Sequence, residues 1–579
     1  MDAPGDLPTF RLSGADFISL GSGYGTDAAL GVLSSFEASK RLILLKGIYE
    51  AASSHEEWKA AHLADAWDLL LDVIDRRRDI REEVLNHPFV EVWATRSLGR
   101  MEDSRAGLDY LSSLAAAAAI RAGTDFELVI TSSTSDLFLP TVGLAYGLGP
   151  GKVTVRFRGG DLTFAGADTT VTVPAPYTED TPGWCASRRV TVESPAGRLT
   201  VTLEDLDPYR NCFGLPVTPR LDQAATSELA STLEASWRLM AADYPEHAAA
   251  VLRCVRSLVP LVRPATGSTS GSAQTAFGAV AVSPADPAGL ALLLIHETQH
   301  VKLGAVLDFA RLFVPGDGLY HAPWRADPRP VRALLQGVYA HAGVADFWRV
   351  RRSRTDGNQA RMADFEFAYW LAQSRMAARE LAGSDELTPV GERFIRSLIG
   401  TLDGWAATPL DATLATGVED LMTAVAVRWR LDNHRPEPDA VASLVAAWQD
   451  GHRCPPLGAA SVPPSADGRP ANVDGLAAQV RARLTATTPP PADPGDQAYL
   501  EGRLGDAITA YRAAATDVPE DPRGWVGLAV AVRRAGDPDA ARSLVERPDL
   551  VRVMSIELRK TGRPAPPDAL AAWLAAGLQ

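Results

Sequence analysis

Apolar side chains in the first part of the chain recur every three or four positions. The runs 28–51 and 56–80 both show this spacing, which is typical of amphipathic helices. Further along, the pattern changes to short β-branched runs separated by glycine, as in 152–157. Such runs are typical of strands joined by tight turns. The sequence therefore predicts an N-terminal helical region, 1–125, followed by an antiparallel β region, 126–215.

A strand and a helix are predicted around the most distinctive motif of the chain. The apolar run 275–282 has the composition of a strand, which could lie inside a sheet or offer an edge to an extended peptide. Asp286 and Pro287 then supply an N-cap and a first helical residue, and a helix is predicted to continue to about Phe313. Its apolar run ends in an H-E-x-x-H motif, His296-Glu297-Thr298-Gln299-His300.

This motif has the spacing of a metal site. On a helix, His296 and His300 lie one above the other, so both rings can reach one ion at about 2.0–2.1 Å. Glu297 is adjacent and could move a proton on a metal-bound water. The alternative is a buried helix with two chance histidines. Two of only ten histidines at this spacing favour the metal site.

A third ligand is predicted on a second helix, 331–351. His341 shares one face of that helix with apolar residues such as Val338 and Ala345. It could be a hydrogen-bonded core histidine, but a two-histidine site in need of another ligand favours metal binding. His321, in the preceding loop, is the rival ligand, and Glu297 could also bind the ion. Loop ligands are held less rigidly, which favours His341.

The motif by itself indicates a zinc metallopeptidase, but the residues around it fit that class poorly. The segment after His300 lacks the glycine and histidine of one peptidase class, and the helix 331–351 lacks the glutamate ligand of another. Nitrogen-rich sites with open positions also suit iron(II), which can bind a 2-oxo acid and dioxygen together. The far carboxylate of such an acid needs a cation, ideally arginine. Arg325 and Arg329 are candidates, although either could be a solvated surface group.

The sequence predicts that the C-terminal part is a separate module. The catalytic region is predicted to span 216–454, followed by a breaker-rich linker, 455–487. Residues 488–579 then carry a 34-residue pattern of small and aromatic positions that is typical of tetratricopeptide-like helical repeats. The predicted fold class is α+β, predominantly helical, with an antiparallel β region, an H-E-x-x-H helix and these C-terminal repeats.

Composition and charge narrow the class of function. The chain has 579 residues and a formal net charge of −14, which argues against binding to nucleic acid or to an anionic membrane. Its four cysteines are scattered without a C-x-x-C pair, as expected for a reduced, cytoplasmic protein. The longest apolar runs are too short to span a bilayer, and the acidic N-terminus is unlike a signal peptide.

Several segments form a pattern that extends beyond the motif: 39–45, 87–88 with Trp93, 207–210, 277–280, 294–300, and 322–330 leading to 337–341. Together they resemble one family, the H-E-x-x-H peptide-modification proteins that occur beside ribosomally made peptides and radical-enzyme partners. The resemblance covers about residues 12–431, and its most specific part is the block around the arginines.

The resemblance implies a function. Members are described as iron(II)- and 2-oxoglutarate-dependent peptide β-hydroxylases, which implies His296 and His300 as iron ligands, with His341 as third ligand. It implies a precursor peptide as substrate and a radical enzyme of the same pathway as a possible partner. The arginine assignment is an inference from the chemistry of 2-oxo acids. A zinc metallopeptidase with Glu297 as base is the alternative, and a non-catalytic peptide-binding scaffold is the second alternative.

Overall fold

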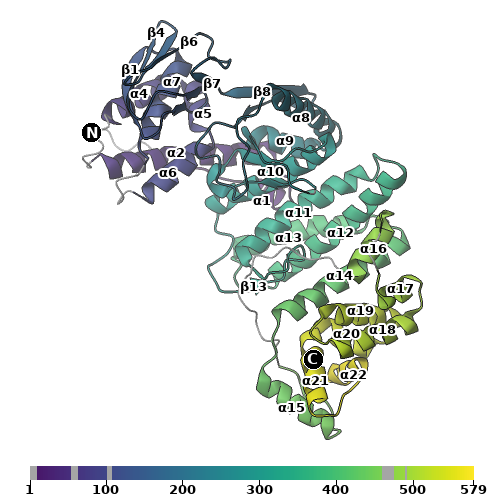
Figure 1. Ribbon diagram of the computed structural model, residues 1–579. Helices are drawn as coiled ribbons and strands as arrows, with labels where there is room; N and C mark the ends of the chain where they lie inside the picture. Colours follow the sequence, from purple (N-terminus) through teal and green to yellow (C-terminus); the bar gives the residue numbers. More distant parts are fainter. Residues whose placement is uncertain are drawn as a thin grey trace. The chain divides into compact units, whose positions relative to one another are not determined.

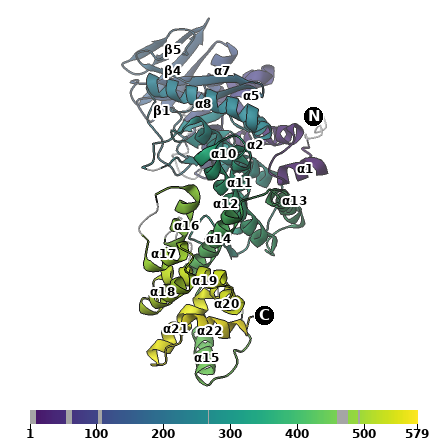
Figure 2. The ribbon, with the colours of Figure 1, turned by 90° about the vertical axis from the view of Figure 1, so that its right-hand side faces the viewer.

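The computed structural model describes residues 9–53, 63–100, 107–265, 267–458, 475–488 and 492–578. The chain forms two compact units, Met1–Arg311 and Leu312–Gln579, shown in two views in Figures 1 and 2. The division falls inside the predicted catalytic region, between the helix with the H-E-x-x-H motif and the helix with His341. The five-part domain division made from the sequence stays a prediction.

The first unit begins with helices, as predicted. The predicted helix 56–80 is interrupted at Arg77, and its first residues, 56–62, lie outside the described part of the chain. Helix α7 is buried along almost its whole length, because a run of alanines lets neighbours approach closely. The helices are α1 (Gly14–Gly21), α2 (Asp27–Ala52), α4 (Leu63–Arg76), α5 (Arg78–Leu85), α6 (Phe89–Leu98) and α7 (Asp109–Ala122).

The β-branched runs form an antiparallel sheet with strand order β1-β4-β5-β6. Strand β4 alternates buried and exposed residues, so one face of the sheet enters a core shared with α4 and α7, which lie beside it in Figure 1. A smaller antiparallel sheet has the order β2-β3-β7. The strands are β1 (Phe126–Ser132), β2 (Leu137–Leu139), β3 (Gly143–Ala145), β4 (Gly151–Arg158), β5 (Asp161–Ala165), β6 (Thr170–Val173) and β7 (Trp184–Ala186).

The third sheet has five strands in the order β11-β12-β10-β9-β8. It is mixed, whereas the sequence predicted only antiparallel strands. Strand β10 pairs parallel to both β9 and β12, so strands from the predicted antiparallel region join strands beyond residue 215. Strand β12 is interior, and the edge beside it is β11. The strands are β8 (Arg188–Ser194), β9 (Gly197–Leu203), β10 (Ser257–Pro260), β11 (Ser270–Gly271) and β12 (Ala279–Val282), with a 3-10 turn at Gln274–Ala276 before β12.

Three helices complete the first unit: α8 (Gln223–Asp243), α9 (Pro245–Cys254) and α10 (Pro287–Phe309). The N-terminus of α10 is as predicted: the Asp286 side chain accepts a hydrogen bond from the Gly289 amide, and proline occupies the first helical position. The helix ends earlier than predicted, at Phe309, because Ala310 is extended.

The second unit is helical. A short hairpin, β13 (Leu319–Tyr320) and β14 (Arg329–Pro330), precedes α11 (Val331–Arg351), whose bounds match the predicted helix. The next helices are α12 (Gly357–Ala382), α13 (Pro389–Ala406), α14 (Ala412–Asn433) and α15 (Pro438–Gln449).

The C-terminal helices share one hydrophobic core with α12, α14 and α15 rather than forming a core of their own. Helix α16 (Leu476–Thr485) lies within the predicted linker, of which 459–474 is outside the described residues. Figure 2 shows α18, α19 and α20 packed side by side, but their assignment as tetratricopeptide-like repeats stays a prediction. The last helices are α17 (Pro494–Leu500), α18 (Leu504–Asp517), α19 (Pro522–Ala535), α20 (Pro538–Glu546), α21 (Pro548–Lys560) and α22 (Pro567–Ala575).

Within the described ranges, every helix is too short or too polar to cross a membrane.

Candidate metal centre

Helix α10 brings His296, Glu297 and His300 together. The His296 and His300 rings meet edge to face with centroids 4.9 Å apart, one helical turn from each other. Nε2 of His296 lies 3.9 Å from Oε1 of Glu297. Two atoms that each bind one ion at about 2.1 Å can be no more than about 4.2 Å apart. The spacing of this nitrogen and this oxygen therefore fits a shared ion or an ion and its bound water.

The local electrostatics suit a cation. Burial, and to a smaller extent the neighbouring His300, lower the pKa of His296 to about 4, against a smaller opposing effect of Glu297. A histidine with so low a pKa is neutral at pH 7, and the neutral imidazole is the form that binds metals. The pair of His296 and Glu297 therefore suits a cation, whereas the ligand atoms of His296, Glu297 and His300 do not all lie within 4.8 Å of one another.

The Glu297 carboxylate is buried and held by two neutral donors. The Ser270 hydroxyl donates to Oε1 and the Ser272 hydroxyl donates to Oε2, both at 2.6 Å. These serines come from β11 and the residue after it, 27 and 25 positions away along the chain. No sequence signal assigned them to the site, because serines in a polar stretch read as loop residues.

The opposite side of α10 is anchored to the α1–α2 connection. The buried Lys302 ammonium donates to the carbonyls of Gly23 and Tyr24 at 2.8 and 2.7 Å, and the Gln299 amide donates to Gly23 at 3.0 Å. Burial lowers the pKa of Lys302 to about 7. These bonds fix the rotation of α10 about its axis, and so fix which face presents the two histidines.

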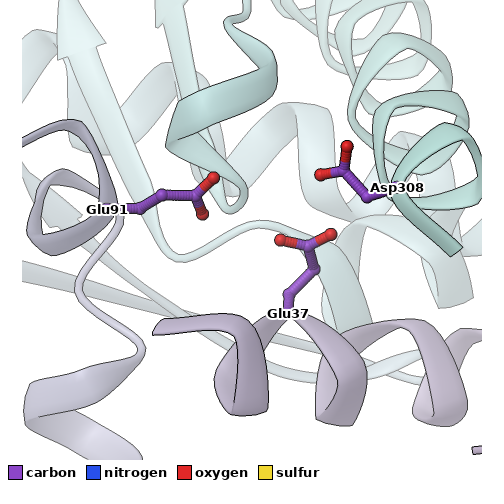
Figure 3. A group of neighbouring side chains, drawn as sticks. All are labelled: Glu37, Glu91 and Asp308. Carbon is purple, nitrogen blue, oxygen red and sulfur yellow. The ribbon is translucent and has the colours of Figure 1, made fainter. Parts of the chain in front are cut away.

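A second group in the same unit has metal-like geometry and was missed by sequence reasoning. Glu37 on α2, Glu91 on α6 and Asp308 on α10 point toward one another in Figure 3, and one oxygen from each lies within 4.8 Å of the other two. Among the described residues this is the only group of three such ligand atoms that converges so closely. The three residues are far apart along the chain, so no spacing could have revealed them.

Lys40 fills this acidic group. Its ammonium lies 2.7 Å from Glu37 and 2.9 Å from Glu91, and it also contacts Asp308. Burial opposes the charged form of Lys40, but the Glu91 and Glu37 carboxylates outweigh it and raise its pKa. A lysine that contacts all three carboxylates takes the place of a metal cation, so this acidic group is a buried ion-pair network.

In the second unit, the two predicted arginines converge on one buried acid. Asp327 accepts from Nε of Arg325 at 2.6 Å and from Nη1 of Arg329 at 3.0 Å. Burial would raise the pKa of Asp327, but the two guanidinium hydrogen bonds outweigh it and lower the pKa. Each arginine side chain is about 30% exposed. A guanidinium has five N–H donors, so neither arginine spends all of them on Asp327.

His341 is held between two indole rings. Its ring stacks on Trp324 with centroids 4.3 Å apart and on Trp370 at 4.7 Å. Nδ1 lies 2.8 Å from the Gly337 carbonyl, an acceptor, so this nitrogen carries the proton. Nε2 is then the nitrogen with the lone pair. Metal-binding histidines commonly have such a partner, but core histidines do too, so its role as third ligand stays a prediction.

His321, the rival, is more deeply buried and stacks on Trp429 with centroids 4.5 Å apart. Burial lowers the pKa of His321 to about 3, and the nearby Arg430 and His434 contribute. Its Nε2 is buried without a hydrogen-bond partner among the described residues. The structure thus places His296, Glu297 and His300 in the first unit, and Arg325, Arg329, His341 and His321 in the second.

Neither a scan against protein-family models nor a search of curated proteins finds a match for this chain. The site must therefore be interpreted from its own chemistry.

Proposed function

We propose that this protein is an iron(II)- and 2-oxoglutarate-dependent hydroxylase that acts on the β-carbon of a side chain in a ribosomally made precursor peptide. The observation that carries the metal site is the pairing, on one buried helix, of a neutral His296 with a carboxylate oxygen of Glu297 3.9 Å away. The 2-oxo acid part of the proposal rests on the arginine-rich block and on the N–H donors that Arg325 and Arg329 keep beyond their bonds to Asp327.

The residues have distinct roles in this proposal. His296 and His300 hold the iron, with His341 as the sequence-predicted third ligand. The iron, when bound, supplies the activation of dioxygen that an unactivated carbon requires. Glu297, beside His296, is either a further ligand or a base next to the iron. Arg325 and Arg329 bind the far carboxylate of 2-oxoglutarate, because paired guanidinium groups match a carboxylate in shape and charge.

The alternative is a zinc metallopeptidase. It needs a carboxylate that accepts a proton from the metal-bound water. Glu297 would be that carboxylate, but the helix 331–351 lacks the glutamate ligand that one peptidase class needs. The second alternative, a non-catalytic peptide-binding scaffold, predicts no stoichiometric metal.

The test is anaerobic. The purified full chain is titrated with iron(II) and then with 2-oxoglutarate, and a weak visible charge-transfer band is expected when the oxo acid binds the iron. Arg329→Gln should raise the concentration of 2-oxoglutarate needed for half the band by about 10-fold or more, since a charged hydrogen bond is worth roughly 1.5–3 kcal/mol. Arg311→Gln, an arginine without a predicted site role, is the control.

Product analysis completes the test. Coexpression with the neighbouring precursor peptide should add the mass of one oxygen to that peptide, and His296→Ala should abolish the addition. If the protein shows no band, binds zinc tightly and cleaves peptides, with Glu297→Gln abolishing cleavage but keeping metal, the hydroxylase proposal is wrong.

A further inference from the structure

Ser270 and Ser272 are placed on one face of a strand by backbone geometry. Side chains two positions apart in an extended segment point the same way. Strand β11 pairs antiparallel with β12, with Ser270 opposite Val282 and Gly271 opposite Ala281. Both serine hydroxyls therefore reach toward α10, while the residue between them faces away.

The register of this segment is fixed from both ends. A Cβ added to Gly271 would lie 3.0 Å from Leu215, so the side away from α10 is closely packed. At the start of the strand, the Thr269 amide donates to the Ser283 hydroxyl and the Ser283 amide donates back to the Thr269 carbonyl, both at 2.9 Å. A slip of one residue would turn both serines away from Glu297 and drive a side chain into Leu215. The serine positions are thus built into the sheet.

The two hydrogen bonds hold both oxygens of Glu297. Each is 2.6 Å long, one to Oε1 and one to Oε2. A buried carboxyl group without hydrogen-bond partners would be costly. Because each oxygen accepts one hydroxyl, each keeps a further lone pair that can face a cation.

We propose that Ser270 and Ser272 are positioning residues that fix the Glu297 carboxyl group and direct its Oε1 toward Nε2 of His296, so that a cation bound there meets this oxygen. We call these two hydroxyls the serine cradle. The inference rests on the proposed function, because it assumes that a metal binds beside His296. It adds two residues, from a segment outside the motif, that determine how tightly the metal is held.

The experiment measures metal affinity in the full chain, independently of turnover. Iron(II) is titrated anaerobically into the wild type, Ser270→Ala, Ser272→Ala and the double variant. The double variant should bind iron at least about 10-fold more weakly, since loss of a partner of a metal-site residue commonly costs 10–100-fold. Ser270→Thr and Ser272→Thr keep a hydroxyl and should stay within about threefold of the wild type. If the serines only stabilised the fold, iron affinity would not depend on whether the replacement keeps a hydroxyl group.

Ser268→Ala is the matched control, because Ser268 precedes the cradle by two positions and is exposed. It should leave the affinity unchanged. Circular dichroism identifies any variant that fails to fold, and the single alanine variants with their threonine counterparts then decide the question. If folded alanine variants bind iron like the wild type, or if threonine fails to restore the loss, the cradle inference is wrong and the proposed function stands. If the wild type itself binds no iron(II), the proposed function fails and the inference fails with it.

Discussion

Two buried acidic sites in the first unit are stabilised in opposite ways. Within the described part of the chain, the hydrogen bonds to Glu297 come from two hydroxyl groups, one on each oxygen, and its Oε1 lies beside His296. Glu37 and Glu91 instead face the ammonium of Lys40, and Glu91 also lies 3.6 Å from the guanidinium of Arg41. Both arrangements avoid the cost of an unpaired buried charge. Only the second already holds protein cations among its carboxylates.

The comparison shows why convergent carboxylates are weak evidence for a metal. By geometry alone, the group of Glu37, Glu91 and Asp308 is the better cage, since its oxygens lie within 4.8 Å of one another. Its counter-charge is already present as a protein side chain. The site around Glu297 has fewer converging atoms, and no lysine or arginine among the described residues is hydrogen-bonded to Glu297. Three experiments test this contrast.

Removing the lysine should break the ion-pair network. Lys40→Met keeps the length of the side chain but leaves buried carboxylates without their main partner, which typically costs about 3–5 kcal/mol. Urea denaturation at pH 7 should show this loss in the free energy of unfolding of the first unit. Millimolar Ca²⁺ should restore part of it, because oxygen ligands that converge in this way suit a hard cation. The wild type should not respond.

Lys46→Met is the control for this loss. Lys46 lies on the same helix and pairs with Glu50 at 3.5 Å, but both side chains are more than 60% exposed. Such a pair contributes about 0–1 kcal/mol. If Lys40→Met costs no more than Lys46→Met, the network does not stabilise the fold. If Ca²⁺ stabilises the wild type equally, the cluster is a metal site after all.

The pKa of Glu37 makes the network sensitive to pH. Burial raises this pKa to about 7, and Lys40 offsets part of the effect. Because the folded pKa lies above the usual 4.5, the folded protein binds the extra proton between about pH 4.5 and 7. The contribution of this group to stability therefore falls as the pH rises through that window and is level above it. At 1.36 kcal/mol per pKa unit the change is at most about 3 kcal/mol.

Glu37→Gln should remove this dependence. A plot of unfolding free energy against pH should be flatter for Glu37→Gln than for the wild type between pH 4.5 and 7. Glu50→Gln, on the exposed part of the same helix, should leave the plot unchanged. Identical slopes for the wild type and Glu37→Gln would show that Glu37 stays ionised throughout, and that Lys40 dominates its surroundings.

The third experiment tests the prediction that His341 of α11 is a ligand of the iron bound by His296 and His300. His341→Ala should weaken iron binding by about 10-fold or more, roughly 1.4 kcal/mol, while His321→Ala should not. His341→Phe is a sharper variant, because it keeps a ring between Trp324 and Trp370 but has no lone pair. It should lose the same affinity with less effect on folding. The reverse result, with loss only in His321→Ala, would make His341 a core histidine.

Local signals in the sequence predicted much of the framework. The start of α10 follows from Asp286 and Pro287, since an N-cap and a first-turn proline act within a few residues. The bounds of α11 follow from its apolar face between Pro330 and Arg352. The β-branched runs did form strands. These features depend on neighbours in the chain, so the sequence alone could reveal them.

Pairings between distant segments escaped the sequence. The parallel pairing of β10 with β9 and β12 depends on how the sheet assembles. A run of apolar residues does not show whether its strand will pair parallel or antiparallel. The predicted end of α10, at about Phe313, was also wrong. The helix ends at Phe309 because Ala310 is extended, although the residues that follow are compatible with a helix.

The sequence by itself determined the chemical inventory of the candidate site: two histidines at metal spacing, a glutamate between them, and arginines suited to a carboxylate. Only the tertiary structure decided which groups surround each acid, because those groups come from far along the chain. Serines from a polar stretch hold the buried Glu297, whereas a lysine on another helix pairs with Asp308 at the end of the same α10. Folding supplies these partners through space, and a linear pattern of residues carries no record of them.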